Sequence, residues 1–547
     1  MFNYKDKNIL IVDDQKAFHI MLRNMLTNQG ASAQKISFAE NAEGAVKLAE
    51  KKTFDLFLVD YNLGSGKNGV QLIDFLRQKE LITNHAICFI ITGDNNKGMV
   101  LTALEKSPDD YLMKPFSQTQ LLNRLRKAAQ KKEVVVDIFD ALQKQEYSQA
   151  IALCKEKINQ SADYRKLCKA LLADIYIEIE KYEDAERILK PLVENRPLIR
   201  ASISLGKAYY LQDKLSEAIN LLNIVIQNSP LQIEAYQWLS RTYKKNGELE
   251  KALATLSYAA SITNHSIERH QEVAILANEM NEHKLVISSY SAILQLSRNS
   301  FYPNPCHLAN YIRCILEYAL SEDDLIDRKI ILKQVSSALY QSRFEEGRNK
   351  DFDFNCFDEI CQSKVFFALN EPLKAKRKLL STLEQNDKKP EEFETTLLCE
   401  ALFSLLDIGE FDYAAPFLKE IKQRDIIDST MQTAINKQTG SALKARMSTF
   451  KKYNTLGIQA FSQHLYESAL THFNQALQLE PLNSGALLNC IQVHLELIKI
   501  AKDNQQVDLL HHCQKNFNLL NNTRLPSEHA KRQKQLQQEF MEIKVIR

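Results

Sequence analysis

The sequence predicts two architectures in one chain: a doubly wound α/β domain with a five-stranded parallel sheet, followed by an all-α helical solenoid. Three observations indicate this division. Seven of the 14 glycines lie in the first 98 residues, and the other 449 residues contain only seven. Short apolar runs alternate with amphipathic stretches in the first part. A segment of about 34 residues recurs in the second part, which is typical of a stacked helical array.

Five apolar runs near the N-terminus have the length and composition of buried strands. In order they read "NILIV", "ISF", "DLFLV", "AICFII" and "DYLM". Amphipathic stretches such as residues 18–29 and 69–78 lie between them. Continuously apolar strands that alternate with helices indicate a parallel sheet covered on both faces. We therefore expect a doubly wound domain over residues 1–130.

The second part carries a sequence repeat with alanines at regular positions. Ala150, Ala185, Ala218 and Ala252 are spaced by 35, 33 and 34 residues. Around three of them a common template recurs, for example "LGKAYYLQDKLSEAINLLNIVIQNSP", and "LGIQAFSQHLYESALTHFNQALQLEP" repeats it far downstream. A helix–turn–helix unit with small residues at this period resembles tetratricopeptide repeats. The resemblance predicts a solenoid but does not name its ligand.

We expect five segments along the chain. They are a first domain over 1–130, a first repeat sub-array over 131–300, a divergent helical segment over 301–360, a second sub-array over 361–520 and a C-terminal helix over 521–547. Neither glycine nor proline occurs between Pro115 and Pro191. The helix expected from residue 118 to residue 132 could therefore continue into the repeats without a flexible linker.

Composition limits the classes of protein to which the chain could belong. Charged residues make up 25% and hydrophobic residues 45% of the sequence, as in an ordinary globular protein. A formal net charge of +2 gives no global attraction to nucleic acid, and no apolar run reaches the roughly 20 residues of a membrane helix. Ten cysteines occur without a CxxC pair, which suits reduced thiols. We expect a cytoplasmic protein with no membrane span and no nucleic-acid partner.

Polar residues follow four of the predicted strands at the point where each strand ends. Asp13 and Asp14 follow the first strand, Asp60 the third, Thr92 the fourth and Lys114 the fifth. Because the carboxyl ends of parallel strands meet at one edge of the sheet, these side chains should lie together. Three carboxylates repel one another unless a cation joins them, and oxygen ligands suit Mg²⁺.

This pattern resembles the receiver domain of bacterial two-component response regulators over residues 5–130. The resemblance implies that Asp60 accepts a phosphoryl group and that Thr92 and Lys114 bind the phosphoryl oxygens. It implies further that Mg²⁺ is held by Asp14 and Asp60 directly, by Asp13 through water and by the backbone carbonyl of Asn62. Tyr111 matches the aromatic switch residue of the family. The loop "YNLGSGKNG" departs from the family pattern, since it lacks the usual proline and has three glycines.

Simpler interpretations exist for several of these residues. An acidic pair such as Asp13 and Asp14 can cap a helix, and Tyr111 can be a half-buried strand aromatic. Tyr236 and Trp238 fit core packing better than a concave binding surface. The stretch from Glu400 to Leu402 has the letters of a cyclic-di-GMP phosphodiesterase motif, but Ser404 stands where that family has arginine. We therefore interpret this stretch as part of a repeat helix.

Taken together, these patterns predict a phosphorelay response regulator with a protein-binding output. We expect a sensor histidine kinase or a small phosphodonor to phosphorylate Asp60. The repeats would bind a protein, such as a kinase or another response regulator, and we expect no enzymatic output. The alternative is a transcription regulator that binds DNA through an unrecognised output surface, which needs a basic face and a helix-turn-helix that we do not find.

Overall fold

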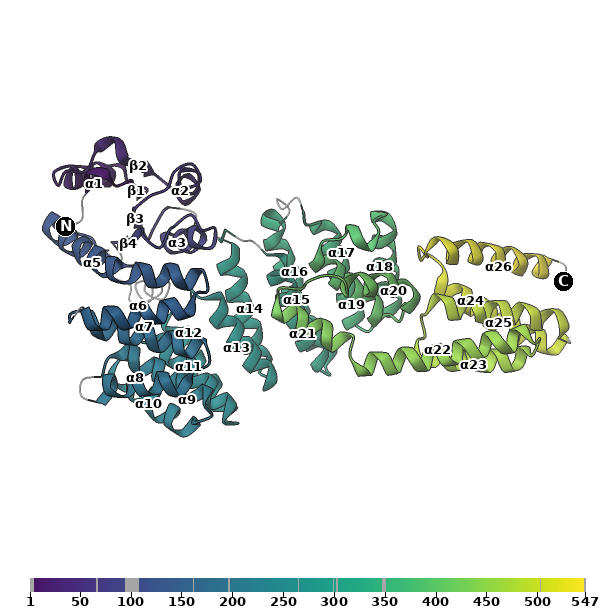
Figure 1. Cartoon of the computed structure of the whole chain (residues 1–547). Helices are drawn as coiled ribbons and strands as arrows, with labels where there is room; N and C mark the ends of the chain where they lie inside the picture. The colour runs from purple at the N-terminus through teal and green to yellow at the C-terminus, as the bar shows by residue number, and fades with distance from the viewer. Residues whose placement is uncertain are drawn as a thin grey trace. The chain divides into compact units, whose positions relative to one another are not determined.

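The computed structural model describes ten stretches of the chain: residues 4–64, 67–93, 108–160, 162–194, 197–263, 265–298, 300–301, 304–346, 351–501 and 503–545. Contacts between residues divide the chain into two compact units, Met1–Pro303 and Asn304–Arg547. The first unit contains an α/β domain and a first helical array, and the second unit is a second helical array (Figure 1). In the described parts, no helix is long and apolar enough to cross a membrane.

The α/β domain contains a five-stranded sheet. Its strands are β1 (Ile9–Val12), β2 (Ile36–Ala39), β3 (Leu56–Asp60), β4 (Ile87–Thr92) and β5 (Asp110–Met113). Its helices are α1 (Lys16–Thr27), α2 (Ala42–Ala49), α3 (Gly69–Gln78) and α5 (Gln118–Gln143). All neighbouring strands are parallel, in the order β2-β1-β3-β4-β5. The predicted fold of this domain is confirmed.

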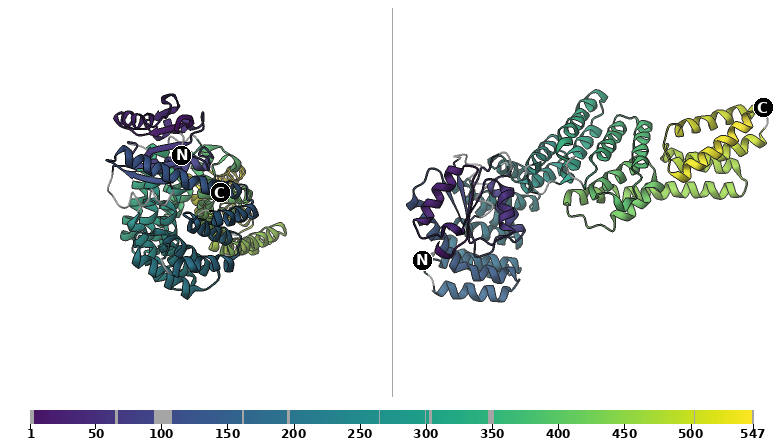
Figure 2. Two further views of the ribbon diagram at one scale, coloured as in Figure 1. Left: turned by 60° about the vertical axis from the view of Figure 1, so that its left-hand side comes forward. Right: turned by 90° about the horizontal axis from the view of Figure 1, so that it is seen from above.

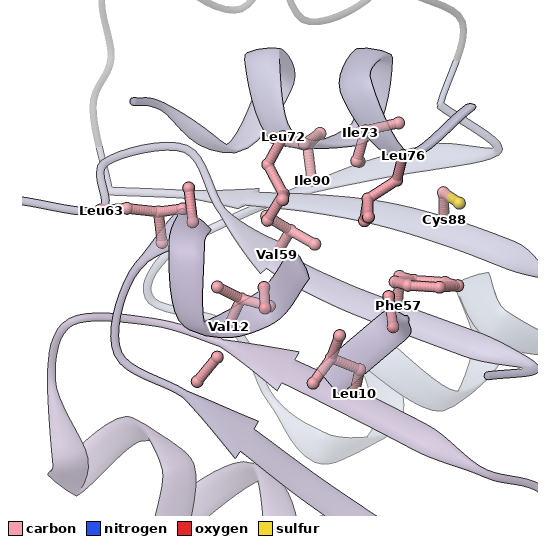
Figure 3. Packing of buried hydrophobic residues seen from close by; sticks show 14 of the residues in the cluster. Leu10, Val12, Phe57, Val59, Leu63, Leu72, Ile73, Leu76, Cys88 and Ile90 are labelled. Carbon is pink, nitrogen blue, oxygen red and sulfur yellow. The ribbon is translucent and has the colours of Figure 1, made fainter. Parts of the chain in front are cut away.

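Alternate residues of each strand face opposite layers of helices. Leu10, Phe57 and Ile90 belong to a core with α2 and α3, and Figure 3 shows side chains of α3 lying over these strands. Their strand neighbours Ile11 and Leu58 belong to a second core with α1 and α5. Because both faces are covered, the three central strands β1, β3 and β4 are buried along their whole length, which explains their continuous apolar runs in the sequence.

The first helical array consists of helices that pack against their neighbours in sequence. They are α6 (Tyr147–Gln160), α7 (Arg165–Glu178), α8 (Tyr182–Glu194), α9 (Ile199–Leu211), α10 (Leu215–Asn228), α11 (Ile233–Lys245), α12 (Leu249–Ile262), α13 (Ile267–Glu279) and α14 (His283–Arg298). The four template alanines, Ala150, Ala185, Ala218 and Ala252, are all fully buried. The predicted solenoid is therefore confirmed, and its period arises from helix pairs.

The second helical array has the same helix-pair construction (Figure 2). Its helices are α15 (Pro305–Ser321), α16 (Leu325–Glu346), α17 (Phe354–Ala368), α18 (Pro372–Asn386), α19 (Thr395–Asp407), α20 (Phe411–Ile421), α21 (Ser429–Gln438), α22 (Ser441–Ser462), α23 (Tyr466–Leu479), α24 (Ser484–Ile500), α25 (Asp503–Leu520) and α26 (Ser527–Val545).

Three charged side chains with little exposure to solvent join helices of the second array. Glu400 of α19 pairs with Arg313 of α15 and Lys364 of α17. Burial alone would raise the pKa of Glu400, but the two cations hold it below its usual value. Glu400 is thus a packing residue of a repeat helix.

Glycines at the template's small-residue position let paired helices approach closely. A Cβ added to Gly206 of α9 would lie 2.8 Å from the side chain of Leu222 on α10. A Cβ on Gly457 of α22 would lie 2.6 Å from the ring of Phe473 on α23. Real Cβ atoms do not come so close to a neighbour, so a larger residue forces the helices apart.

Replacing Gly206 by alanine should therefore destabilise the first unit. The clash should lower the free energy of unfolding by about 1–3 kcal/mol. The better helix propensity of alanine offsets at most about 1 kcal/mol of this loss. Thermal unfolding followed by circular dichroism, which reports both units, measures this change, and the fluorescence of Trp238, the only tryptophan, assigns it to the first unit. The control is Gly485→Ala in α24, where the nearest atom would be 3.4 Å away. A Gly206→Ala protein with an unchanged melting temperature would contradict the close-packing explanation.

The two aromatic residues singled out from the sequence have different environments. Tyr236 is 5% exposed and belongs to the core of the first array, as predicted. Trp238 is only half-buried. Its ring lies beside Tyr210, with Lys207 5.3 Å and Arg241 4.8 Å from the ring centroid. Trp238 therefore packs on the array while part of its ring remains accessible.

Candidate functional site

The predicted polar side chains meet at the carboxyl edge of the sheet. Asp13 directly follows β1, Asp60 is the last residue of β3, Thr92 is the last residue of β4 and Lys114 directly follows β5. Asp13, Asp60 and Thr92 are each at most 5% exposed. Parallel pairing places the ends of β1, β3, β4 and β5 side by side, so the topology alone brings residues far apart in sequence into one site.

Lys114 is held between two carboxylates. Its Nζ lies 2.8 Å from Oδ2 of Asp13 and 3.3 Å from Oδ2 of Asp60. The ring of Phe18 on α1 lies beneath the ammonium group, with 3.8 Å between Nζ and the ring centroid. The peptide bond between Lys114 and Pro115 is cis, and the backbone N–H of Lys114 donates to the carbonyl of Thr92 at 2.7 Å. These contacts position one cation over the two buried acids.

The acidic residues form a compact oxygen cluster. Asp13, Asp14 and Asp60 each offer a carboxylate oxygen within 4.8 Å of the others. The pKa of Asp60 is raised to about 6, chiefly by burial; the negative charges of Asp13 and Asp14 contribute to the rise, and Lys114 opposes it. The single positive charge of Lys114 therefore does not neutralise the negative charges of the three carboxylates. Because Asp14 is exposed and all the donors are oxygens, the cluster fits a hydrated Mg²⁺ ion.

The loop from β3 to α3 contacts the acidic site at two places, Gly64 and Gly69. The N–H of Gly69 donates to the carbonyl of Tyr61 at 2.9 Å. A Cβ on Gly69 would lie 2.1 Å from the carbonyl oxygen of Asp60, so this position requires glycine. Gly64 has a φ of +80° and lies next to Asp14. Asn62, a predicted metal ligand through its carbonyl, is an exposed residue of this loop. Residues 65 and 66 of the unusual loop sequence lie outside the described residues.

Tyr111 lies on β5, half-buried against the core that contains α3. The guanidinium carbon of Arg124 lies 5.5 Å from the centroid of the Tyr111 ring. Arg124 also donates to the carboxylate of Asp110 at 2.7 Å and to the carbonyl of Tyr111 at 2.8 Å. The ring thus lies between the core that contains α3 and the guanidinium group of Arg124 on α5. The switch role of Tyr111 remains a prediction.

Two features of the site were not predicted from the sequence. The ring of Phe18 packs against the ammonium group of Lys114. The position of Phe18 in the first turn of α1, shortly after the acidic pair, is a signal in the sequence that could have predicted this contact. Lys114 contacts Asp13 more closely than Asp60, although the sequence analysis gave Asp13 only a water-mediated role at the metal. The sequence identified the members of the site but not their pairing.

The chain matches family models in two places. Residues 9–126 match the response regulator receiver domain, and residues 141–205 match the tetratricopeptide repeat. The first match spans the five strands and every residue of the acidic site. The N-terminal domain is a response regulator receiver domain. Tetratricopeptide repeats follow it, and this combination fits a protein of two-component signalling.

Curated relatives match the chain over part of their length. The nitrate/nitrite response regulator protein NarL of Escherichia coli (strain K12) is 34% identical over 132 residues, which is 24% of this chain and 57% of that protein. The transcriptional regulatory protein YvrH of Bacillus subtilis (strain 168) is 30% identical over 122 residues, or 22% of this chain and 48% of that protein. The chain therefore spans about half the length of the relatives it matches.

Solved structures also resemble parts of the chain. A CheY-like receiver domain protein from Methanospirillum hungatei JF-1 is 24% identical and covers 23% of this chain and 96% of its own, with a TM-score of 0.21. A MamA RS-1 ArsTM double mutant is 18% identical and covers 30% of this chain and 94% of its own, with a TM-score of 0.27.

Proposed function

We propose that the protein is a two-component response regulator that accepts a phosphoryl group on Asp60 and signals by binding a protein through its helical repeats. The phosphodonor would be a sensor histidine kinase or a small phosphodonor. A kinase or another response regulator of the same pathway is the kind of partner we expect for the repeats. The observation that carries this proposal is the unbroken helix α5, which joins the receiver domain to the first array.

The acidic site has the groups that phosphoryl transfer needs. An oxygen of Asp60 would form a bond to phosphorus as the bond from phosphorus to the donor's histidine nitrogen breaks. Lys114 is placed to neutralise charge on the transferred group, and the Thr92 hydroxyl would donate to a phosphoryl oxygen. Asp13, Asp14, Asp60 and the carbonyl of Asn62 would hold Mg²⁺, which supplies electrophilic stabilisation when bound.

Helix α5 is anchored to the receiver domain beyond the edge of the sheet. Asn84 donates to Asp140 and to Gln143, each at 2.9 Å, and His85 contacts Asp140 at 3.2 Å. Lys132 pairs with Asp109 at 3.1 Å. The last turns of α5, from Val135 to Ala141, also pack on α6 and α7 in a shared core. Displacement of α5 in the receiver domain would thus be transmitted to the first repeats (Figure 1).

Inserting a flexible Gly/Ser segment beside Lys132 should uncouple the two domains. Phosphorylation of Asp60 should still occur, because no group of the acidic site is changed. The effect of phosphorylation on partner binding should be lost, since a flexible segment does not transmit a helix displacement. Phosphoryl uptake and partner affinity would both be measured, and a parallel insertion after Asp163, an exposed turn residue, serves as the control. Coupling that survives the insertion at Lys132 would contradict the role of α5.

The outer face of α16 provides a surface that suits protein binding. Ile326, Ile330, Tyr340 and Phe344 are between 55% and 82% exposed. Their spacing places them along one side of the helix, opposite the buried Val335. A row of exposed apolar side chains on one helix is unusual for a protein without a partner there. This row supports protein binding by the repeats.

Replacing both Ile330 and Tyr340 by serine should therefore weaken partner capture. A loss of at least about tenfold in affinity is expected, since central apolar contacts dominate interface energies. The matched control is Ile427→Ser, which removes an isolated side chain that is 94% exposed. Equal capture by the double variant and the control would show that the α16 face does not bind the partner.

Affinity capture tests the proposed function as a whole. The tagged protein would be compared with and without beryllofluoride and Mg²⁺, which together imitate the phosphoryl group on Asp60. A partner whose recovery changes with the mimic supports the proposal, and identical capture contradicts it. The alternative is direct DNA binding, which the B. subtilis relative, a transcriptional regulatory protein, suggests. Salt-dependent binding to duplex DNA would favour that alternative.

A further inference from the structure

The chain returns to the receiver domain at the end of the first array. Phe301 follows α14 and stacks on Phe75 of α3, with 4.1 Å between ring centroids and 23° between ring planes. Nζ of Lys67 lies 4.7 Å from the centroid of the Phe301 ring. Phe301 also packs against the core between the sheet and α3. The first array is thus joined to the receiver domain at two places, through α5 and through this ring.

Lys67 is itself held in place by the receiver domain. Its ammonium group pairs with Glu43 of α2, and this hydrogen bond lowers the pKa of Glu43. The side chain of Lys67 is 22% exposed, so its contact with the ring is partly shielded from water. Stacked aromatic pairs and cation–π contacts each stabilise a docked ring by roughly 1 kcal/mol. Phe301 therefore has a specific binding place.

The loop that carries Lys67 also borders the acidic site. Gly69, two residues after Lys67, lies against the carbonyl oxygen of Asp60, and Gly64 lies next to Asp14. A change of charge at Asp60 therefore acts on Gly69, which is two residues from Lys67. The phosphoryl acceptor and the binding place of Phe301 are thus connected through residues 67–69.

Phe301 lies immediately before the boundary between the two compact units, which falls between Pro303 and Asn304. We propose that Phe301 is a phosphorylation-sensitive latch, held by Lys67 and Phe75 in the unphosphorylated protein and released when the phosphoryl group on Asp60 displaces residues 67–69. Release detaches Phe301 from α3. This inference rests on the proposed function and adds a second route by which the receiver domain controls the repeats.

Limited trypsin digestion of the full chain tests the latch. Cleavage after Arg298, the last residue of α14, reports release of the nearby Phe301 from α3. The cleavage is identified by the masses of the two fragments. In the unphosphorylated protein, Phe301→Ala should raise the initial cleavage rate about tenfold. Lys67→Met should raise the rate by a smaller factor. The matched control is Tyr258→Ala, which removes another ring contact in the first array, with Tyr236, and should leave the rate unchanged.

Addition of beryllofluoride and Mg²⁺ should raise the cleavage rate of the wild-type protein and leave that of Phe301→Ala unchanged. Binding of the mimic is followed independently by its ¹⁹F resonance. If the mimic binds and the wild-type rate does not change, the latch is wrong and the proposed function stands. If no bound resonance appears, the proposed function fails and the latch fails with it. A Phe301→Ala rate equal to that of wild type also overturns the latch.

Discussion

Replacing Asp60 by asparagine is expected to abolish phosphoryl uptake completely. An amide lacks the anionic oxygen that attacks phosphorus, and the other two acids of the cluster, Asp13 and Asp14, are not placed at the end of β3. Removing the cation with Lys114→Ala should slow uptake by about 10²–10³-fold, as is typical when one charge-stabilising group is lost. Incorporation of label from acetyl phosphate measures both effects.

The Asp60→Asn protein should remain folded. Asparagine removes one of three mutually repulsive carboxylates, so the melting temperature of the receiver domain should be equal to or higher than that of wild type. The control is Asp163→Asn, an exposed position in the first array that should label normally. Stoichiometric labelling of Asp60→Asn would show that the acceptor is another residue.

Replacing Lys376 by alanine should destabilise the second unit by about 3–5 kcal/mol, because it leaves a buried carboxylate without its counter-ion. Lys376 is fully buried, and its Nζ lies 2.8 Å from Glu410, whose side chain is 2% exposed. The same ammonium group donates to the hydroxyl of Ser484 at 2.8 Å and to the carbonyl of Leu482. Burial lowers the pKa of Lys376, and Glu410 opposes this. The pair therefore joins α18, the start of α20 and the start of α24.

Urea unfolding with two probes locates the effect of Lys376→Ala. Circular dichroism reports both units, whereas the fluorescence of Trp238 reports only the first. The circular dichroism midpoint should fall and the Trp238 midpoint should not. Lys374→Ala is the matched control, since Lys374 lies on the same helix and is 62% exposed, and it should cost less than about 1 kcal/mol. An equal, small effect of both substitutions would show that the buried pair does not stabilise the fold.

Much of the fold and the composition of the site follow from local sequence patterns. Buried parallel strands require apolar runs, and the ends of those runs identify Asp13, Asp60, Thr92 and Lys114 before any coordinates are known. The topology then fixes one edge of the sheet as their meeting place. The template alanines likewise mark the helix-pair contacts, because only a small side chain fits there.

Other features depend on contacts between residues distant in sequence. Nothing in the local pattern distinguishes Lys376 from the exposed Lys374, because both lie in one charged helix and only tertiary packing buries one of them. The stacking of Phe301 on Phe75 is equally hidden, since it depends on how the first array returns to the receiver domain. The helix expected from residue 118 does continue to Gln143, as the absence of glycine and proline allowed, but the contacts of its final turns with the receiver domain do not follow from the local pattern.

Helix α5 should carry the phosphorylation state of Asp60 to the repeats. Hydrogen exchange of the full chain, measured by mass spectrometry with and without beryllofluoride and Mg²⁺, tests this coupling, with Asp60→Asn as the control. We expect changed exchange in α6 and α7, which pack on the end of α5, and no change in the Asp60→Asn protein. Changes confined to the receiver domain, with α6 to α14 identical in both states, would show that the repeats do not respond to Asp60.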